Sequence, residues 1–244
     1  MKFKTRIKQQ FSRAAAHYDE AAQLQYQCAQ ELAVILPNIQ PQRILDVGTG
    51  TGYGIEALQN RYPQAILYGI DLSHAMLLEA QKKVSSSLLS AADFDSLPFA
   101  DQSIDFIFSS LAWQWSPDFK ISLNEAARVL KPGGTLLFST LTAGSLRELH
   151  AKHFLTETVI RSTLQQTGFI LQTHFLETRR QYFTSAKAVL DSLKKIGASA
   201  QAEIKHQDMN ARTRLKHLEA LYPKDEKGYP LTYKILFISA RRAP

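Results

Sequence analysis

Residues 44–52 are Ile44-Leu45-Asp46-Val47-Gly48-Thr49-Gly50-Thr51-Gly52, an apolar run that leads into alternating glycines. A short apolar run of this kind predicts a buried strand. Glycines let the backbone turn tightly and come close to a ligand. In a doubly wound α/β domain, the turn after the first strand lies where ligands bind. The stretch therefore predicts a ligand site between the first strand and the helix that follows it.

The spacing of these glycines separates two classes of ligand. The dinucleotide fingerprint G-x-G-x-x-G, counted from Gly48, requires glycine at position 53, which is Tyr53. Asp46 places a carboxylate beside the ligand, and a carboxylate repels a pyrophosphate but attracts a cation. S-adenosylmethionine has an ammonium and a sulfonium group and lacks phosphate. The stretch therefore favours S-adenosylmethionine, with S-adenosylhomocysteine as product, and disfavours a nicotinamide dehydrogenase.

The remaining sequence alternates between patterns typical of strands and of helices. We expect strands at 43–48, 65–71, 87–93, from 104 onward, 135–141, 169–183 and 227–242. We expect helices at 5–36, 52–62, 73–84, 118–131, 156–167 and 185–222, the last broken near Gly197. This order predicts an α/β fold with a doubly wound, mostly parallel seven-stranded sheet.

We expect a single domain over residues 1–244. Its parts would be an N-terminal helical cap at 1–36, an α/β core at 37–184 and 223–244, and a helical insertion at 185–222, before the last strand. The sequence Pro132-Gly133-Gly134 predicts that a helix ends before it, with the fifth strand after it.

Two further carboxylates follow expected strands. Asp71 ends the second strand and could accept hydrogen bonds from both hydroxyls of a ribose. Asp93 follows the third strand, where its carboxylate could accept from an adenine amine while Phe94 covers the ring. Helix capping by Asp71 and a plain turn at Asp93 remain alternatives. With Asp46, the three strand ends suit one nucleoside.

The composition limits the location and the partners. The chain of 244 residues has one cysteine, Cys28, which excludes an intramolecular disulfide and favours a cytoplasmic location. We find no apolar run that could span a membrane and no apolar segment typical of a secretory signal. The net charge of +7 suits an acidic partner, such as nucleic acid, a phosphorylated substrate or an acidic carrier protein. Since neither zinc-ligand spacing nor an RNA-binding signature is present, we expect no metal and no nucleic acid.

The motifs resemble those of a known superfamily. The glycine stretch, Asp71, Asp93-Phe94 and the segment Arg128–Gly134 look like the class I methyltransferases. Other segments are similar to the malonyl-[acyl-carrier-protein] O-methyltransferases of biotin synthesis, and they are Phe11–Asp19, Leu24-Gln25, Leu111–Trp115, Phe138–Leu141, Gly144–Leu149, Leu193–Ala198 and Tyr229–Tyr233. Thr49 stands where this family commonly has cysteine, and the stretch between Leu149 and Phe154 looks shortened.

The resemblance implies a reaction. The methyl group of S-adenosylmethionine would pass to the free carboxylate of a malonyl thioester on acyl carrier protein or coenzyme A. A carboxylate is ionised at pH 7, so no general base is required. Catalysis would come from alignment of oxygen, methyl and sulfur, and from exclusion of water while two opposite charges are neutralised. A lid is therefore expected, and residues 1–36 and 185–222 are the candidates.

The resemblance also implies site residues. Tyr18, Trp113 and Gln114 are the candidate catalytic residues, although core packing remains an alternative for the aromatic ones. Tyr18 would close over the methionine part or bind the substrate carboxylate, and Gln114 would donate to it. The candidate cofactor-binding residues are Tyr18, Gln25, Asp46, Gly48, Thr49, Gly50, Gly52, Asp71, Leu72, Met76, Asp93, Phe94, Ser109 and Leu111.

Charged residues could recognise the substrate and its carrier. An arginine is the natural clamp for a carboxylate, and Arg147, Arg179 and Arg180 are equal candidates. The insertion is enriched in basic residues that could attract an acidic carrier protein or simply form a solvated surface: Lys194, Lys195, Lys205, Arg212, Arg214 and Lys216. Other functions stay open, namely a methyltransferase acting on another small acid or on RNA, or a catalytically silent fold. The sequence does not predict an oligomeric state.

Overall fold

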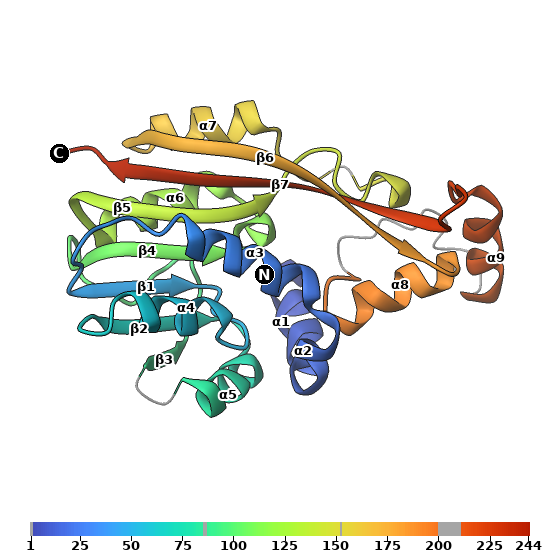
Figure 1. Cartoon of the computed structure of the whole chain (residues 1–244), viewed down its shortest axis with the longest axis horizontal. Helices are drawn as coiled ribbons and strands as arrows, with labels where there is room; N and C mark the ends of the chain where they lie inside the picture. The colour runs from blue at the N-terminus through green and yellow to red at the C-terminus, as the bar shows by residue number, and fades with distance from the viewer. Residues whose placement is uncertain (1, 85–86, 152, 200–210) are drawn as a thin grey trace.

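The computed structural model describes residues 2–84, 87–151, 153–199 and 211–244, which fold around one sheet (Figure 1). Its strands are β1 (Arg43–Val47), β2 (Ile66–Asp71), β3 (Leu88–Ala91), β4 (Ile104–Ser110), β5 (Leu130–Leu141), β6 (Phe169–Phe183) and β7 (Tyr229–Arg242). The strand order is β3-β2-β1-β4-β5-β7-β6. Strands β1 to β5 pair in parallel, and β7 runs antiparallel between β5 and β6. The predicted mostly parallel seven-stranded sheet is confirmed.

Helices connect these strands. They are α1 (Lys2–Ala14), α2 (Tyr18–Ala21), α3 (Gln23–Val34), α4 (Tyr53–Arg61), α5 (His74–Lys83), α6 (Phe119–Val129), α7 (Glu157–Gln166), α8 (Ala186–Lys195) and α9 (Ala211–Leu221), with short 3-10 turns η1 (Ala15–His17), η2 (Trp113–Trp115) and η3 (Arg147–Leu149). Ser73 caps α5, as its position predicts, by accepting a hydrogen bond from the backbone N–H of Met76. None of the helices within the described residues is long and apolar enough to cross a membrane.

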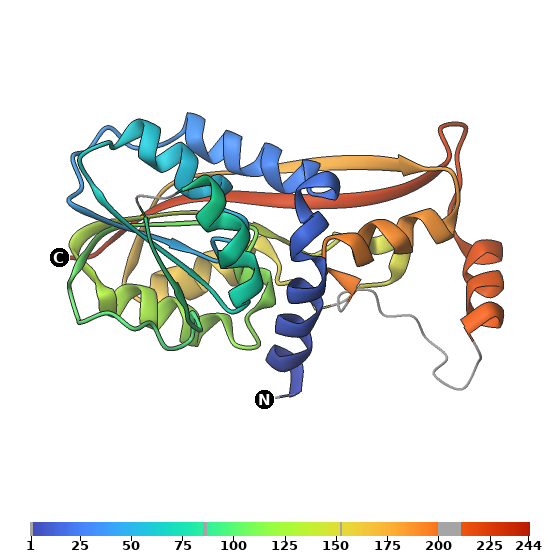
Figure 2. The same ribbon diagram turned by 90° about the horizontal axis from the view of Figure 1, so that it is seen from below.

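Both faces of the sheet are buried. In β1, Ile44 belongs to one apolar cluster and Leu45 to another, because successive side chains of a strand point to opposite faces. Leu32 of α3 and Leu58 of α4 join the first cluster, and Leu123 of α6 joins the second. Figure 2 shows α3 and α4 on one face of the sheet and α6 on the other. The core is therefore double-sided, as a parallel sheet requires.

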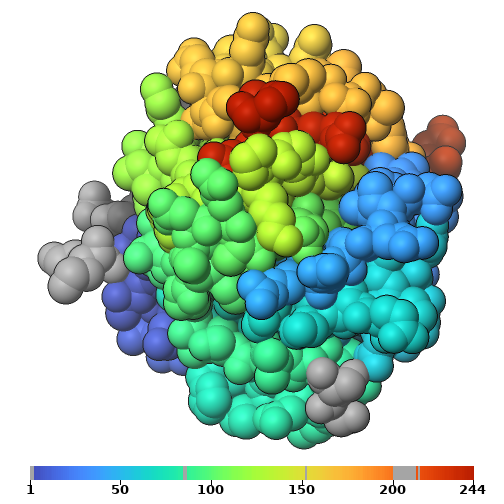
Figure 3. Space-filling model, turned by 90° about the vertical axis from the view of Figure 1, so that its left-hand side faces the viewer, coloured from blue at the N-terminus to red at the C-terminus, as the bar shows by residue number. Residues whose placement is uncertain are grey.

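Helices α1 and α2 lie at the carboxyl ends of the parallel strands. In Figure 1, α1, α2 and α8 lie beside the carboxyl ends of the parallel strands, and α1 contacts both α5 and α8. Strands β6 and β7 continue past the other strands, up to the pair Phe183 and Tyr229, and carry α8 and α9 with them. Figure 3 views the molecule from the opposite end, where α1, in dark blue, is seen only at the margin. Helices α1 and α8 thus flank the edge where ligands are expected.

Two expected elements differ from the structure in detail. Residues 5–36 are helical as predicted, but they are divided into α1, η1, α2 and α3, with a break at the fully buried Ala22, which has a ψ of 33°. The fifth strand was predicted from residue 135, yet β5 begins at Leu130. Leu130 pairs with Ile104 and Thr135 with Phe106, so the intervening residues bulge out of the ladder. The predicted break near Gly197 is confirmed, since α8 ends at Lys195.

Candidate active site

A pocket opens at the carboxyl ends of β1, β2 and β4. Residues of α1, α5 and α8 complete its walls. Of the candidate residues, those that line it are Tyr18, Gln25, Gly48, Gly50, Asp71, Leu72, Met76, Asp93, Phe94, Leu111 and Gln114. A smaller recess shares Tyr18, Gln25, Gly48 and Gly50 with this pocket and adds Asp46 and Thr49. The structure therefore brings together most of the side chains that the sequence singled out.

The glycine turn is shaped by close contacts. Gly48 has a φ of 74°, and a Cβ built on it would lie 2.3 Å from the Cβ of Ala112, so a larger residue does not fit. The backbone N–H groups of Gly48 and Thr49 both donate to the carbonyl oxygen of Ile70 at 2.9 Å, which ties the turn to β2. A Cβ built on Gly50 would meet only open space. The backbone at Gly50 is thus exposed to the pocket.

Two carboxylates flank this turn, the buried Asp46 and the partly buried Asp71. Asp46 is 2% exposed, its Oδ2 atom has no hydrogen-bond partner, and burial raises its pKa to about 7. The Oδ2 atom of Asp71 accepts from the N–H of Gly50 at 3.0 Å and its Oδ1 atom from that of Ser73 at 2.7 Å. Burial raises the pKa of Asp71 to about 6. A cation between these groups would favour their ionised forms.

Tyr18 enters the pocket from the start of α2. Its hydroxyl forms no hydrogen bond with any described residue, and burial together with the charge of Asp71 raises its pKa above the ordinary value. Asp19, the next residue, holds α2 against the glycine turn because it accepts a hydrogen bond from the hydroxyl of Thr51 at 2.6 Å and pairs with Lys83. Tyr18 therefore places a neutral hydrogen-bond donor in the wall of the pocket.

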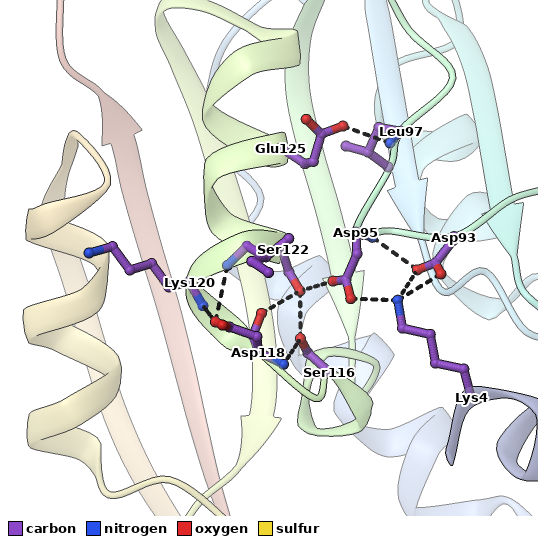
Figure 4. Close-up of polar contacts among 10 residues, drawn as sticks. Lys4, Asp93, Asp95, Leu97, Ser116, Asp118, Lys120, Ser122 and Glu125 are labelled. Atoms are coloured by element: carbon purple, nitrogen blue, oxygen red, sulfur yellow. Dashed lines mark hydrogen bonds and ion pairs between the residues drawn. The ribbon is translucent and has the colours of Figure 1, made fainter. Parts of the chain in front are cut away.

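Lys4 of α1 reaches Asp93 across the pocket. Figure 4 shows its Nζ atom between two carboxylates, 2.7 Å from Asp93 and 2.5 Å from Asp95. The same Nζ atom lies 5.7 Å from the centre of the Phe94 ring. Asp95 also accepts from Ser122 of α6, so the contact continues into the core. Sequence reasoning missed Lys4, which is 89 residues away from Asp93.

The Gln-Trp motif forms η2, directly after β4. Gln114 lines the pocket, and its Nε2 atom donates to the carbonyl oxygen of Leu111 at 2.5 Å. Trp115 also lines the pocket and meets Phe11 edge-on, with ring centres 5.2 Å apart. Trp113 instead packs on Phe138 and lines a separate recess behind Gln114. Gln114 and Trp115 thus lie at the ligand edge, and Trp113 lies one layer behind.

Comparison with known proteins identifies the family of this chain. A family model described as a methyltransferase domain matches residues 45–138. A malonyl-[acyl-carrier protein] O-methyltransferase of Erwinia billingiae is 35% identical, with 96% of each chain covered. The corresponding protein of Dechloromonas aromatica is 33% identical, covering 98% of this chain and 95% of that protein. The chain belongs to the malonyl-[acyl-carrier protein] O-methyltransferase family.

Solved structures agree on the fold of this methyltransferase. A putative methyltransferase from Bacillus halodurans matches with a TM-score of 0.67 and 16% identity over 88% of this chain and 99% of that one. A phosphoethanolamine N-methyltransferase of Haemonchus contortus, solved with S-adenosylhomocysteine, matches with a TM-score of 0.57 and 20% identity over 89% of this chain and 52% of that one. The predicted fold, family and methyltransferase activity are confirmed.

Some candidate residues of the methyltransferase lie outside the pocket. Gly52, with a φ of 95°, is the N-cap of α4, and Ser109 is fully buried, where its hydroxyl donates to the carbonyl oxygen of Val47. Gly52 therefore ends the glycine turn, and Ser109 ties strand β4 to strand β1. Within the part of the chain that the structure describes, no cluster of three potential metal ligands is present.

None of the three candidate arginines of the methyltransferase lines the pocket. Arg147 pairs with Glu148, and Arg179 pairs with Glu31 and Glu177. Arg180 is exposed on β6. The sequence allowed each of them as a carboxylate clamp because it does not show which way a residue of a turn or a strand will face.

Proposed function

We propose that this chain methylates the free carboxylate of a malonyl thioester carried on acyl carrier protein, with S-adenosylmethionine as methyl donor, in biotin synthesis. The observation that carries the proposal is the division of the pocket into two ends. Carboxylates stand at one end, with Asp46 buried and Asp71 and Asp93 partly buried, and apolar side chains stand at the other with no arginine from the described residues. The names of the full-length relatives support this acceptor. A cytosolic location belongs to the same proposal.

The carboxylate end fits S-adenosylmethionine. The unpartnered Oδ2 atom of Asp46 is suited to an ammonium group, and Asp71 is suited to the ribose hydroxyls. Asp93 and Phe94 are suited to the adenine amine and ring. The backbone at Gly50, which faces open space, leaves room for the ligand. When bound, the cofactor supplies a methyl group on a cationic sulfur, ready for attack by a nucleophile.

The other end fits a carboxylate that must lose its charge. Trp115, Leu141 and Leu193 exclude water there, and Tyr18 and Gln114 supply neutral donors. The nucleophile is already ionised at neutral pH, so no side chain has to remove a proton. During transfer, the negative charge of the carboxylate and the positive charge of the sulfonium disappear together. An arginine would stabilise the ionised acceptor more than the transition state, so neutral donors suit this reaction better.

The exposed insertion suits an acidic carrier. Lys194 and Lys195 of α8 and Lys216 of α9 are exposed, and Leu193 of the same α8 lines the pocket. Lys205 lies outside the described residues, as do the side chains of Arg212 and Arg214. Positive charge beside the apolar end of the pocket, where the acceptor would bind, would steer an acidic carrier protein towards it. We call this end the acceptor end.

The assay for this proposal compares acceptors. The purified protein is mixed with S-adenosylmethionine and malonyl-carrier protein, malonyl-coenzyme A, free malonate or transfer RNA, and methylation is followed by mass spectrometry. We expect a mass gain of one methyl group on the malonyl thioesters, with the carrier-bound form preferred. Methylation of RNA or free acids alone would favour the alternative methyltransferases. Cofactor binding without turnover on any acceptor would favour a silent fold.

A further inference from the structure

A tyrosine that no motif assigned to the site lies at the acceptor end of the pocket. Tyr233 of β7 lines the pocket beside Leu141 and Leu193 and is 4% exposed. Its hydroxyl forms no hydrogen bond with any residue that the structure describes. The hydroxyl is not one of the atoms sealed in the core without a partner, and the residue lines the pocket wall. A phenol that lines a pocket and bonds no described residue is a candidate for a ligand contact.

The two neighbours of Tyr233 are fixed by a single loop. The backbone N–H of Thr232 donates to Oε2 of Glu148 at 3.1 Å, and the hydroxyl of Thr232 donates to Oε1 of the same carboxylate. The backbone N–H of Lys234 donates to the hydroxyl of Ser145 at 2.9 Å. Since successive side chains of a strand alternate between faces, Thr232 and Lys234 face this loop and Tyr233 faces the other way, into the pocket.

The loop, residues 142–149, is itself built for rigidity. Leu146 is fully buried with a φ of 50°, and its N–H donates to the carbonyl oxygen of Thr232 at 2.7 Å. Glu148 is 7% exposed, although carboxylates are seldom buried, and Arg147 pairs with it. A left-handed leucine and a buried carboxylate are costly features, and here both serve to hold β7 at Thr232. Tyr233 is thereby held at one place beside the pocket.

We propose that the hydroxyl of Tyr233 donates a hydrogen bond to the acceptor carboxylate, together with Tyr18 and Gln114, and that Glu148 positions Tyr233 through Thr232. This inference rests on the proposed function and names a substrate-binding residue for it. It also gives a purpose to two motifs that the cofactor does not use, Gly144–Leu149 and Tyr229–Tyr233.

A phenol suits the electron movements of the reaction. A lone pair of the carboxylate oxygen forms the new bond to the methyl carbon, the carbon–sulfur bond breaks, and its electron pair stays on sulfur. No proton is transferred, so the donor only has to remain protonated. Burial raises the pKa of Tyr233 above its ordinary value, which keeps the hydroxyl protonated at neutral pH. The methyl ester product is neutral and accepts a weaker hydrogen bond, which favours its release.

The first experiment replaces Tyr233→Phe, which keeps the ring and removes the hydroxyl. We expect the KM for malonyl-carrier protein to rise about tenfold or more, as for loss of a hydrogen bond to a charged group. The affinity for S-adenosylhomocysteine, measured by calorimetry, should not change. Tyr62→Phe is the matched control, because the hydroxyl of Tyr62 donates to the carbonyl oxygen of Pro37, away from the pocket. This control should leave both values unchanged.

The second experiment separates positioning from stability. Thr232→Val removes the hydroxyl that bonds Glu148 and should raise the KM, whereas Thr232→Ser keeps the donor and should restore it. Thr232→Val should add little when Tyr233 is already Phe, a coupling that mere destabilisation would not produce. If the unaltered protein methylates no malonyl thioester, the proposed function fails and this inference with it. If it does so and Tyr233→Phe has the same KM, only the role of Tyr233 is overturned.

Discussion

We expect Asp46 to make ligand binding depend on pH. Its carboxylate is buried with one unpartnered oxygen, and in the free protein its pKa is raised to about 7. A bound cation stabilises the ionised form, so binding lowers this pKa and releases a proton. We therefore expect affinity for S-adenosylhomocysteine, whose ammonium group is retained, to rise with pH up to about 7 and to level off above it. Calorimetry at several pH values, in buffers that differ in ionisation enthalpy, measures both the affinity and the proton.

A charge-neutral variant tests the assignment. Asp46→Asn should bind about tenfold more weakly at pH 8, on the scale of a lost charge-assisted hydrogen bond, and should lose the pH-dependent step. Asp105→Asn is the control, because Asp105 pairs with Lys131 near the other end of β4 and has a lowered pKa. A pH profile shared by Asp46→Asn and the unaltered protein would assign the step to another group, such as Asp71.

Residues with a local signal could be predicted from the sequence, and residues that act over long distances could not. Asp46 and Gly48 belong to one strand and turn, so their spacing alone predicts that they meet the same ligand. Lys4 and Tyr233 reach the pocket from chain segments that are far away in sequence. An isolated lysine or a tyrosine in a strand gives no sign of which way it will face. The fold determines this, and the fold also turned the candidate arginines away from the pocket.

Lys4 links helix α1 to the wall of the pocket at Asp93 and Asp95. Lys4 is 24% exposed and pairs with both Asp93 and Asp95, and these contacts raise its pKa against the effect of burial. A partly buried ion pair of this kind contributes on the order of 1 kcal/mol. We expect Lys4→Met to open α1 more often and to speed release of S-adenosylhomocysteine several-fold. Stopped-flow fluorescence of the tryptophans would measure the release rate.

Helix α1 offers its own control. Lys8 lies one turn further along, lines the same pocket and forms no ion pair with a described residue. Lys8→Met removes an equal charge and should leave the release rate near that of the unaltered protein. Equal acceleration by both variants would mean that net charge, rather than the link to Asp93 and Asp95, retains the ligand. Limited proteolysis should cut within α1 sooner in Lys4→Met alone.

The elements of the core could be predicted, but the breaks in the N-terminal segment could not. Strands β1 and β2 match expectation because apolar runs bounded by Asp, Gly or Pro determine them. The segment 5–36 keeps a helical apolar pattern throughout, so its periodicity gives no reason to stop. The breaks at η1 and Ala22 arise from tertiary packing. The buried Ala22 fits against the core, and Asp19 binds the glycine turn at Thr51.

In the whole molecule, the parallel half of the sheet and the extension formed by β6 and β7 carry different parts of the proposed site. The parallel half carries the glycine turn and its carboxylates, and the long β6–β7 ladder carries Tyr233 together with α8 and α9 (Figure 1). The alternation of strands and helices predicts the first half well. The lengths of the last two strands were also predicted, but their residue pattern does not reveal how they pair with each other and with β5. The proposed contact of Tyr233 with the acceptor therefore could not be predicted from the sequence.

The exposed lysines of α8 predict that electrostatic attraction speeds the association of the carrier protein. The chain has a net charge of +7, and Lys194 and Lys195 are exposed on α8 beside the pocket-lining Leu193. Reversing both to Glu should lower kcat/KM for malonyl-carrier protein at low salt by about tenfold, mainly through slower association. The effect should shrink as salt is raised, because surface charges are screened. Kinetics at several ionic strengths measure it.

A distant pair separates steering from net charge. Lys120 on α6 and Arg161 on α7 are also exposed, and both helices pack on the other face of the sheet. Reversing Lys120 and Arg161 to Glu changes the net charge equally, so it should leave kcat/KM nearly unaltered if α8 is the docking surface. Malonyl-pantetheine, which is uncharged apart from its carboxylate and has no protein to dock, should be methylated alike by all three proteins. If the α8 reversal slowed malonyl-pantetheine as much as malonyl-carrier protein, the lysines would act on the pocket itself, and the carrier would have to dock elsewhere.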